Sequence, residues 1–299
     1  MELINNALVS IVINCYNGEK YLRKSIESVL DQSYQNFELI FWDNQSTDQS
    51  KNIIQSYQDK RIKYFYSPNH TTLYQARNLA LKECKGDYVC FLDVDDYFLR
   101  NKIAKQLLYF NDQKVGVIYS NYYRYYEDIN KKKLLTNKQL PSGNLTQYIL
   151  EESQISFMTV MIRKKSLDSL KFNFDKKYSI IGDYDLLYRL SFNWDFCYIE
   201  EPLAVYRIHK DNFSENSVLF IDELKDWYNK NYSFFINKKN YIYKKIIFFQ
   251  AKEYLSKKNI LKFFIEFWKY PMSINKIKLF LIMIVPNCVL KLLKKSDFK

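Results

Sequence analysis

The sequence predicts an α/β protein with a mostly parallel sheet that carries helices on both faces, followed by a C-terminal helical region. Hydrophobic, strand-like segments alternate with segments of helical spacing through most of the chain. The strand-like segments are apolar at nearly every position, which is typical of parallel strands buried on both faces. Beyond residue 215 the pattern changes to long helical segments rich in lysine and aromatic residues. We therefore expect two domains, 1–215 and 216–299.

The expected elements follow one another as strand, helix and strand. After a first strand at 8–16, the helix at 18–33 places Leu22, Ile26 and Val29 on one face. The segment 130–144 is predicted to be a polar loop because it is rich in lysine and asparagine. The remaining strands are expected at 37–44, 62–67, 88–96, 115–126 and 203–209. The remaining helices are expected at 46–57, at 73–84 and within 179–192, where the helix runs through 186–190. A strand running into a helix is expected at 156–167.

Polar side chains follow three of the predicted strands. They are found at Asn14 to Asn17, at Asp43, and at Asp93 to Asp96. In open sheets of this kind, ligands bind beyond the carboxyl ends of the strands. We therefore expect these three clusters to meet at one edge of the sheet and to form a ligand site.

The positive charge is concentrated in the last part of the chain. The net charge of the 299 residues is +12, and residues 218–299 hold seventeen lysines and six acidic residues, a net +11. A basic segment attached to a nearly neutral domain indicates a localised anionic partner. We expect no nucleic acid partner, because that would favour a uniformly basic surface.

The N-terminal residues and the cysteines indicate a cytoplasmic protein. The first residues lack the basic start and the small-residue cleavage site of a signal peptide. The five cysteines are scattered and include no C-x-x-C pair, so neither a disulfide framework nor a zinc site is predicted. A reducing compartment fits this usage.

The aspartates of "YVCFLDVDDY" can be interpreted in three ways. The carboxylates could simply end a strand and cap the next helix. A calcium loop of the EF-hand type needs glycine and glutamate where this chain has Phe98 and Ala104, so it is excluded. The third interpretation is a divalent cation held by Asp93 and Asp95, because Mg2+ and Mn2+ prefer carboxylate oxygens. With only five glycines and no glycine-rich phosphate loop, a nucleotide would have to be held by metal and side chains.

Five motifs in order carry a family resemblance. They are "VSIVINCYNGEKYLRKSIESVLDQSYQNFELIFWDNQSTD", "ARNLAL", "GDYVCFLDVDD", "GDYDLLYRL" and "YRIHKDNFS". Together they resemble family-2 glycosyltransferases of the GT-A fold over roughly the first 215 residues. Each motif alone is weak, and their order and spacing make the resemblance specific.

The resemblance implies a role for each matching residue. It implies nucleotide binding by Asn14, Tyr16, Asp43, Arg77, Asp93 and Val94, metal binding by Asp93, Asp95 and His209, and a catalytic base at Asp183. The cofactor would be Mn2+ or Mg2+. The chain departs from the family pattern at Asn14-Cys15, where Pro-Thr is common, and at Gly182, where Glu is common.

Several of these residues have a plain structural alternative. Tyr16 could be a core aromatic, Asp43 could be a turn residue, and Arg77 could pair with a surface carboxylate. Asp185 stands two residues from Asp183, so it points in another direction on a helix and is the alternative base.

The resemblance implies a metal-dependent, inverting transfer of a sugar from a UDP-sugar to a glycan or lipid-linked glycan of a bacterial surface polysaccharide. Asp183 would deprotonate the acceptor hydroxyl. Two alternatives are a nucleotidyltransferase that makes sugar nucleotides and a non-catalytic protein that binds them. The first would need a glycine-rich, basic loop after the first strand, which "NCYNGEKY" lacks.

The basic tail is expected either to pack on the catalytic domain or to lie on an anionic membrane. Its apolar run Leu279–Val285 is too short to span a bilayer, which takes about 20 residues. Lysines interleaved with aromatic residues favour a membrane surface. The expected location is therefore cytoplasmic and peripheral on the inner face of the cell membrane.

Overall fold

The computed structural model describes residues 6–151, 154–212, 216–231 and 241–269. The chain divides between Lys210 and Asp211 into two compact units. Within the described ranges, all strands belong to the first unit, and the second unit is helical.

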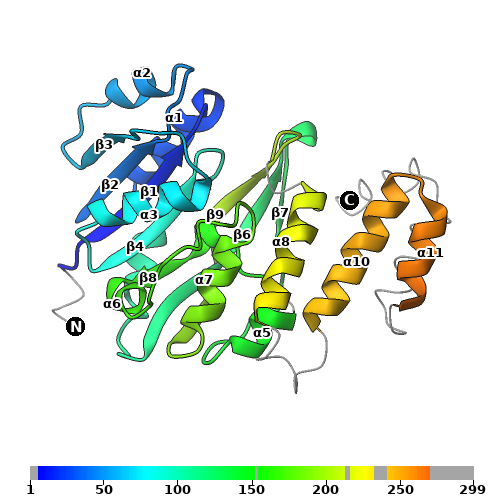
Figure 1. Ribbon diagram of the computed structural model, residues 1–299. Helices are drawn as coiled ribbons and strands as arrows, with labels where there is room; N and C mark the ends of the chain where they lie inside the picture. Colours follow the sequence, from blue (N-terminus) through cyan, green and yellow to red (C-terminus); the bar gives the residue numbers. More distant parts are fainter. Residues whose placement is uncertain (1–5, 152–153, 213–215, 232–240, 270–299) are drawn as a thin grey trace. The chain divides into compact units, whose positions relative to one another are not determined.

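The first unit alternates strands and helices (Figure 1). Its strands are β1 Val9–Cys15, β2 Phe37–Asp43, β3 Ile62–Tyr66, β4 Tyr88–Asp93, β5 Tyr97–Phe98, β6 Val115–Tyr126, β7 Lys131–Leu134, β8 Met161–Arg163 and β9 Asp195–Ile208. Its helices are α1 Glu19–Leu30, α2 Ser50–Gln55, α3 Leu73–Glu83, α4 Lys102–Leu107, α5 Thr146–Glu151, α6 Lys164–Asp168 and α7 Gly182–Leu190, with 3-10 turns at η1 Glu127–Ile129 and η2 Phe157–Thr159.

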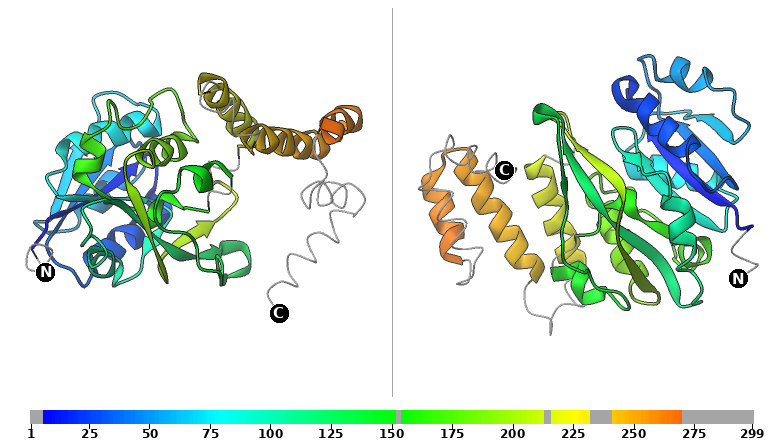
Figure 2. Two further views of the ribbon diagram at one scale, coloured as in Figure 1. Left: turned by 90° about the horizontal axis from the view of Figure 1, so that it is seen from below. Right: turned by 180° about the vertical axis from the view of Figure 1, so that it is seen from behind.

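The strands form one sheet in the order β3-β2-β1-β4-β8-β6-β9-β5, with β7 also paired to β6. The run from β3 to β4 is parallel, as the sequence predicts. β8 is antiparallel to both of its neighbours, whereas the long strands β6 and β9 are parallel and lie side by side (Figure 2). Half of the sheet is therefore the parallel unit whose strand ends can form a ligand site.

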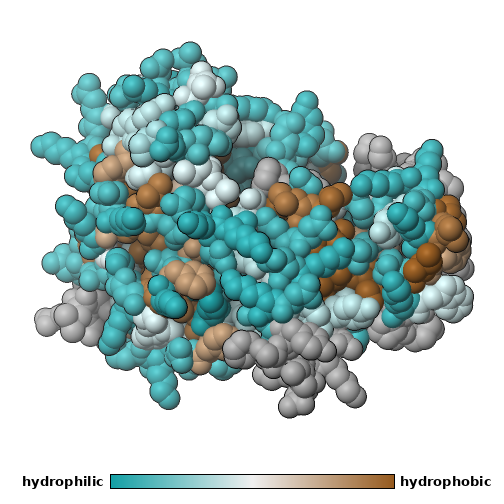
Figure 3. Space-filling view, in the orientation of Figure 1, coloured by the Kyte–Doolittle hydropathy of each residue, from teal (hydrophilic) through white to brown (hydrophobic). Residues whose placement is uncertain are grey.

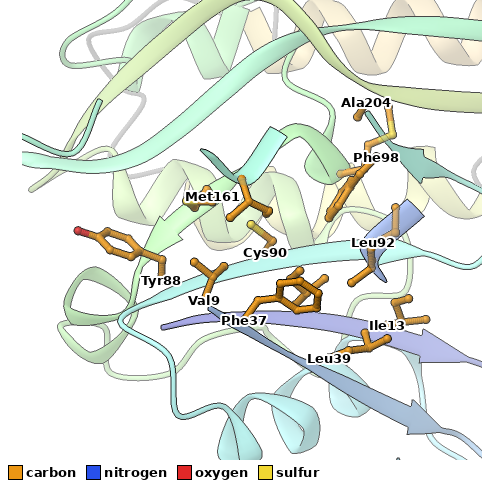
Figure 4. Close-up of a cluster of buried hydrophobic side chains, with 14 of the residues drawn as sticks. Val9, Ile13, Phe37, Leu39, Tyr88, Cys90, Leu92, Phe98, Met161 and Ala204 are labelled. Atoms are coloured by element: carbon orange, nitrogen blue, oxygen red, sulfur yellow. The ribbon is translucent and has the colours of Figure 1, made fainter. Parts of the chain in front are cut away.

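The main core lies between the parallel strands and α1. Alternate residues of β1, such as Val9 and Ile13, pack with Leu22 and Ile26 of α1. Figure 4 shows this cluster, where Phe37, Leu39, Cys90 and Leu92 extend it across β2 and β4. α3 packs against β1 and β2 and is seen across them in Figure 1. The strands are apolar at successive residues because both of their faces are covered.

The helix predicted at 46–57 is shorter, because α2 begins at Ser50. The residues before it are held by the loop after β1. Ser46 Oγ accepts a hydrogen bond from the Asn17 N–H, and the Asp48 carboxylate accepts one from the first residue of α1. These long-range bonds replace the helical turn that the local pattern indicates.

Two predictions of loop and strand length were also wrong. The predicted loop 130–144 contains β7 Lys131–Leu134, an edge strand whose lysines are exposed and resemble a loop in composition. The strand predicted at 203–209 already begins at Asp195 and ends at Ile208. The breaker Pro202 is accommodated by register shifts in the pairing of β9 with β6.

The second unit consists, in its described part, of α8 Ser217–Lys230, α10 Tyr241–Ser256 and α11 Ile260–Lys269. The Asn216 side chain caps α8 by accepting from the Leu219 N–H. Phe263 and Phe267 of α11 are buried in a cluster that includes α10. Among the described residues, no helix is both long and apolar enough to cross a membrane. The apolar run Leu279–Val285 lies outside the described residues.

The turn before β4 tests the packing of this fold. A Cβ atom at Gly86 would lie 2.5 Å from the Ser10 backbone nitrogen and 2.7 Å from the Leu8 carbonyl oxygen. Because backbone atoms cannot rotate away, Gly86→Ala should lower the free energy of unfolding by about 1–3 kcal/mol, measured by urea titration. The exposed neighbour Lys85 is the control, and Lys85→Ala should change it by less than about 0.5 kcal/mol. Equal midpoints for the two variants would contradict the prediction.

Candidate functional site

The carboxyl ends of β1, β2 and β4 lie next to one another in the sheet. Cys15 is paired with Asp43, and Asn14 is paired with Asp93. The chain turns directly after β4, where the Asp96 N–H donates to the Asp93 carbonyl oxygen. The three polar clusters predicted from the sequence therefore meet at one edge of the sheet.

Asp43 behaves in this structure as a turn residue, which was its structural alternative. It is fully buried. Its Oδ1 accepts from the Ser46 N–H at 2.7 Å, and its Oδ2 accepts from the Tyr64 hydroxyl at 2.9 Å. Burial and this hydrogen bond raise the pKa of Tyr64. Asp43 therefore shapes the loop after β2.

Tyr16 and Asn14 lie at the carboxyl end of β1, and they differ in exposure. Tyr16 is 52% exposed, so it is not a core aromatic. Its ring centroid lies 4.3 Å from that of His70, whose Nδ1 is 2.9 Å from the Asn44 carbonyl oxygen. The Asn14 amide nitrogen is buried without a hydrogen-bond partner, which is costly unless a ligand supplies an acceptor. His70 was not predicted, because its loop shows no local pattern.

Arg77 is buried and joined to the end of β4. The Arg77 guanidinium lies 2.6 Å from Asp93 Oδ1, and only 3% of its side chain is exposed. Four aromatic rings surround it, at centroid distances of 4.9–5.8 Å: Tyr74, Phe91, Phe157 and Phe174. Arg77 therefore pairs with a partly exposed carboxylate, and this carboxylate is a predicted site residue.

Asp95 and His209 form a pair beside Asp93. His209 Nε2 lies 3.0 Å from Asp95 Oδ2, which brings together residues 114 positions apart in the chain. Burial raises the pKa of Asp95, as does the Asp93 charge, while His209 opposes the rise. Among the described residues no preformed group of three or more His, Cys, Asp or Glu ligands is present. Mg2+ is usually bound by one or two carboxylates together with substrate phosphates, so Asp93 and Asp95 fit a metal held together with a substrate.

Val94 and Asp96 support the turn after β4 that carries Asp93 and Asp95. The Val94 side chain packs on Gly18, where an added Cβ would lie 3.1 Å away. Asp96 Oδ1 accepts from the Arg207 N–H, and the Arg207 guanidinium donates to the Asp95 carbonyl oxygen at 2.8 Å. Arg207 was not predicted, although it stands only two residues before His209 and both side chains contact the Tyr21 ring.

Asp183 stands in the first turn of α7, with one carboxylate oxygen in contact with two polar groups. Oδ1 lies 2.7 Å from the Tyr184 N–H nitrogen and 3.2 Å from the Tyr74 hydroxyl. Burial raises the pKa of Asp183, against the nearby positive charge of Arg77. A carboxylate with a raised pKa is a better base near neutral pH.

Asp185 forms an ion pair within the same helix. It is buried, and its Oδ2 lies 2.8 Å from an Arg189 guanidinium nitrogen. Arg189 also donates to the carbonyl oxygens of Phe172 and Asn173. Asp185 therefore anchors, through Arg189, the segment before α7.

Comparison with known proteins identifies the family. The model of glycosyl transferase family 2 matches residues 10–170. The chain belongs to glycosyl transferase family 2. It is therefore a glycosyltransferase, and the predictions of a nucleotidyltransferase or a non-catalytic binding protein are not supported.

Two curated relatives and one solved structure show how far the similarity extends. The uncharacterized glycosyltransferase MJ1057 of Methanocaldococcus jannaschii is 31% identical over 264 residues, which cover 84% of this chain and 89% of that protein. The UDP-Glc:alpha-D-GlcNAc-diphosphoundecaprenol beta-1,3-glucosyltransferase WfaP of Escherichia coli is 33% identical over 57% of this chain and 66% of its own. The mannosyltransferase PcManGT of Pyrobaculum calidifontis, solved with GDP-Man and Mn2+, has a TM-score of 0.59 at 14% identity, covering 97% of this chain and 79% of that chain. This likeness confirms the predicted GT-A fold.

Asp183 and Asp185 should differ in their effects on stability. Asp185→Asn should lower the free energy of unfolding by about 1.5–3 kcal/mol, because it removes a charged partner of Arg189. Asp183→Asn should not lower it at pH 7, since a buried carboxylate with a raised pKa costs free energy when it is ionised. Urea unfolding of both variants measures this. A larger loss of unfolding free energy for Asp183→Asn than for Asp185→Asn would contradict the view that Asp185 is the aspartate that stabilises the fold.

Proposed function

We propose that the protein transfers a sugar from a UDP-sugar to a lipid-linked glycan, with a divalent cation and inversion at the sugar carbon. One observation carries this proposal. Asp93, Asp95 and His209 lie together at the carboxyl edge of the sheet, and side chains of α3 contact both Asp93 and Asp183. Arg77 of α3 holds Asp93, and Tyr74 of the same helix contacts Asp183. α3 therefore links Asp93, on the side of the site proposed for the nucleotide, to Asp183, the proposed base.

The nucleotide would lie along the ends of β1 and β4. Tyr16, exposed beside His70, offers a ring face on which a base can stack. The buried Asn14 amide offers a donor, and Asp93 retains an exposed carboxylate edge, 42% of its side chain, that can bind a ribose hydroxyl. Asp43 would support this site from behind through the loop after β2. Uridine is favoured by the donor in the name of WfaP.

The cation would be Mn2+ or Mg2+, held by Asp95, His209 and Asp93 with the diphosphate oxygens. When bound, it stabilises the negative charge on the departing nucleoside diphosphate. Asp95 and His209 are already adjacent, and Arg207 fixes the Asp95 backbone through a 2.8 Å hydrogen bond. The turn is therefore held in shape before a ligand arrives. The Mn2+ in the PcManGT structure supports a divalent ion in this fold.

Asp183 would act as the base of a single displacement. Its carboxylate takes the proton of the acceptor hydroxyl while that oxygen forms a bond to the anomeric carbon. The bond from this carbon to the phosphate oxygen breaks, and the nucleoside diphosphate leaves with the electron pair. Because Asp185 is paired with Arg189, Asp183 is the carboxylate at the start of α7 that would take this proton. A single displacement inverts the configuration of the anomeric carbon.

The acceptor and the location follow from two further observations. WfaP is named for a diphosphoundecaprenol acceptor, which supports a lipid-linked glycan of a surface polysaccharide as the acceptor of this chain. On α11, Leu261, Ile265 and Trp268 share one face and are 76%, 49% and 74% exposed. Hydrophobic residues gather over α11 in Figure 3. With the basic charge of residues 218–299, this face fits an anionic membrane surface, at the cytoplasmic side of the cell membrane.

If Asp183 is the catalytic base, its substitution should lower kcat without changing the affinity for UDP. Asp183→Asn should lower kcat by at least about 100-fold, because no carboxylate remains to take the proton. Its UDP affinity in Mn2+ should stay within about 2-fold, since Asp183 does not touch the nucleotide. Turnover with a donor that the wild-type enzyme uses, together with calorimetry, measures both. Substantial turnover by Asp183→Asn would refute the assignment.

The metal assignment predicts a dependence of nucleotide binding on Mn2+. Asp95→Ala should weaken UDP binding by about 10-fold or more in Mn2+ and should make it insensitive to EDTA, since a ligand of the bridging cation is lost. His209→Ala should act in the same direction but less strongly, because water can replace one ligand. If UDP affinity is unchanged by both variants and by EDTA in the wild type, no metal bridges the diphosphate.

The membrane assignment predicts that vesicle binding depends on α11. The variant Leu261→Ala/Trp268→Ala should bind anionic vesicles at least about 5-fold more weakly, because less apolar surface enters the interface. Salt should weaken binding of the wild type, since lysines near the membrane contribute about 1 kcal/mol each. Leu108→Ala/Phe192→Ala, which truncates exposed apolar residues of the first unit, should bind like the wild type. Equal co-sedimentation of both double variants would exclude the α11 face.

A further inference from the structure

Tyr74 and Gly182 are in close contact at the start of α7. Tyr74 is buried, with 2% of its surface exposed. A Cβ atom at position 182 would lie 2.5–2.6 Å from three atoms of the Tyr74 ring. Because the two residues are packed this closely, a larger residue at position 182 would displace the ring. The departure of this chain at Gly182 therefore has a structural reason.

The Tyr74 hydroxyl touches two groups on either side of Gly182. It donates to the Ile180 carbonyl oxygen at 2.7 Å and lies 3.2 Å from Asp183 Oδ1. A phenol has one proton to donate and can also accept a hydrogen bond. It can therefore share its proton with an ionised Asp183, and it can accept from a protonated Asp183 while it still donates to Ile180.

The two oxygens of Asp183 consequently have different surroundings. Oδ1 is held by Tyr74 and by the Tyr184 N–H, whereas no described residue bonds to Oδ2. Such an arrangement fixes the carboxylate plane and leaves one oxygen for a substrate proton. Orientation of this kind is a main source of rate enhancement, because the reacting atoms are held in place before reaction.

We propose that Tyr74 is a positioning residue that orients Asp183 through Oδ1 in both of its protonation states, so that Oδ2 faces the acceptor hydroxyl. Tyr74 acts through Asp183 and does not touch the reacting atoms. Arg77 stands one turn further along α3 and holds Asp93, so this helix fixes the base relative to the nucleotide side. The proposal rests on the proposed role of Asp183 as the base.

The charged and titratable groups that face Asp183 are Arg77 and Tyr74 of α3 and Asp93 of β4. Arg77 and the Tyr74 hydrogen bond lower the pKa of Asp183, while burial and Asp93 raise it. Removal of the hydroxyl should therefore raise the pKa of Asp183 and move the acidic limb of the activity profile to higher pH.

Tyr74→Phe tests the proposal, because it keeps the ring and removes the hydroxyl. We expect kcat to fall about 10-fold, the acidic limb of the kcat profile to move up by about 0.5–1 pH unit, and UDP affinity to stay within about 2-fold. Gly182→Ala, which displaces the ring, should shift the acidic limb in the same direction. The matched control is Tyr119→Phe, which removes a buried hydroxyl that donates to the Pro141 carbonyl oxygen. Its pH profile should match that of the wild type.

Two outcomes would overturn the proposal. The first is a Tyr74→Phe enzyme with wild-type kcat and pH profile. The second is an equal fall of kcat in Tyr74→Phe and Tyr119→Phe without a shift of the acidic limb, which would show a structural role alone. An Asp183→Asn enzyme that retains turnover would instead refute the base assignment, so the two failures are distinguishable.

Discussion

The ion pair between Arg77 and Asp93 is the interaction on which the site depends. Arg77 is almost completely buried, and a buried charge is stable only when it is paired. Asp93 and Asp183 raise the pKa of Arg77, while burial lowers it. The guanidinium therefore stabilises the carboxylates on both sides of α3. Without it, the buried Asp183 would lose the neighbouring positive charge that lowers its pKa.

Each carboxylate of the β4 turn has a different partner. Asp93 binds Arg77, Asp95 lies against His209, and Asp96 accepts from the Arg207 N–H. An aspartate cluster at the end of a hydrophobic strand is stable because positive or donating groups from distant parts of the chain reach it. The two aspartates at the start of α7 also have different partners, because Asp185 pairs with Arg189 and Asp183 contacts Tyr74.

The parallel strands, their helices and the meeting of Asn14, Asp43 and Asp93 at one edge could be predicted from the sequence. Local hydrophobic patterns predict the strands and helices, and parallel pairing brings the carboxyl ends of the strands to the same edge. Neither the burial of Asp43 nor the contact of Tyr74 with Asp183 could be predicted. Tyr74 and Asp183 are 109 positions apart, and no local pattern encodes such a contact. Lysine-rich β7 was missed for another reason, since an exposed edge strand has the composition of a loop.

Anomalous diffraction from crystals grown with UDP and Mn2+ would test the account most directly. We expect one manganese peak within coordination distance of Asp95 and His209, with the diphosphate bound to that ion. The uracil ring should lie near Tyr16, and Asp183 Oδ2 should lie on the open side of the terminal phosphate. A nucleotide bound away from the ends of β1 and β4, or a manganese ion that neither Asp95 nor His209 coordinates, would contradict the account.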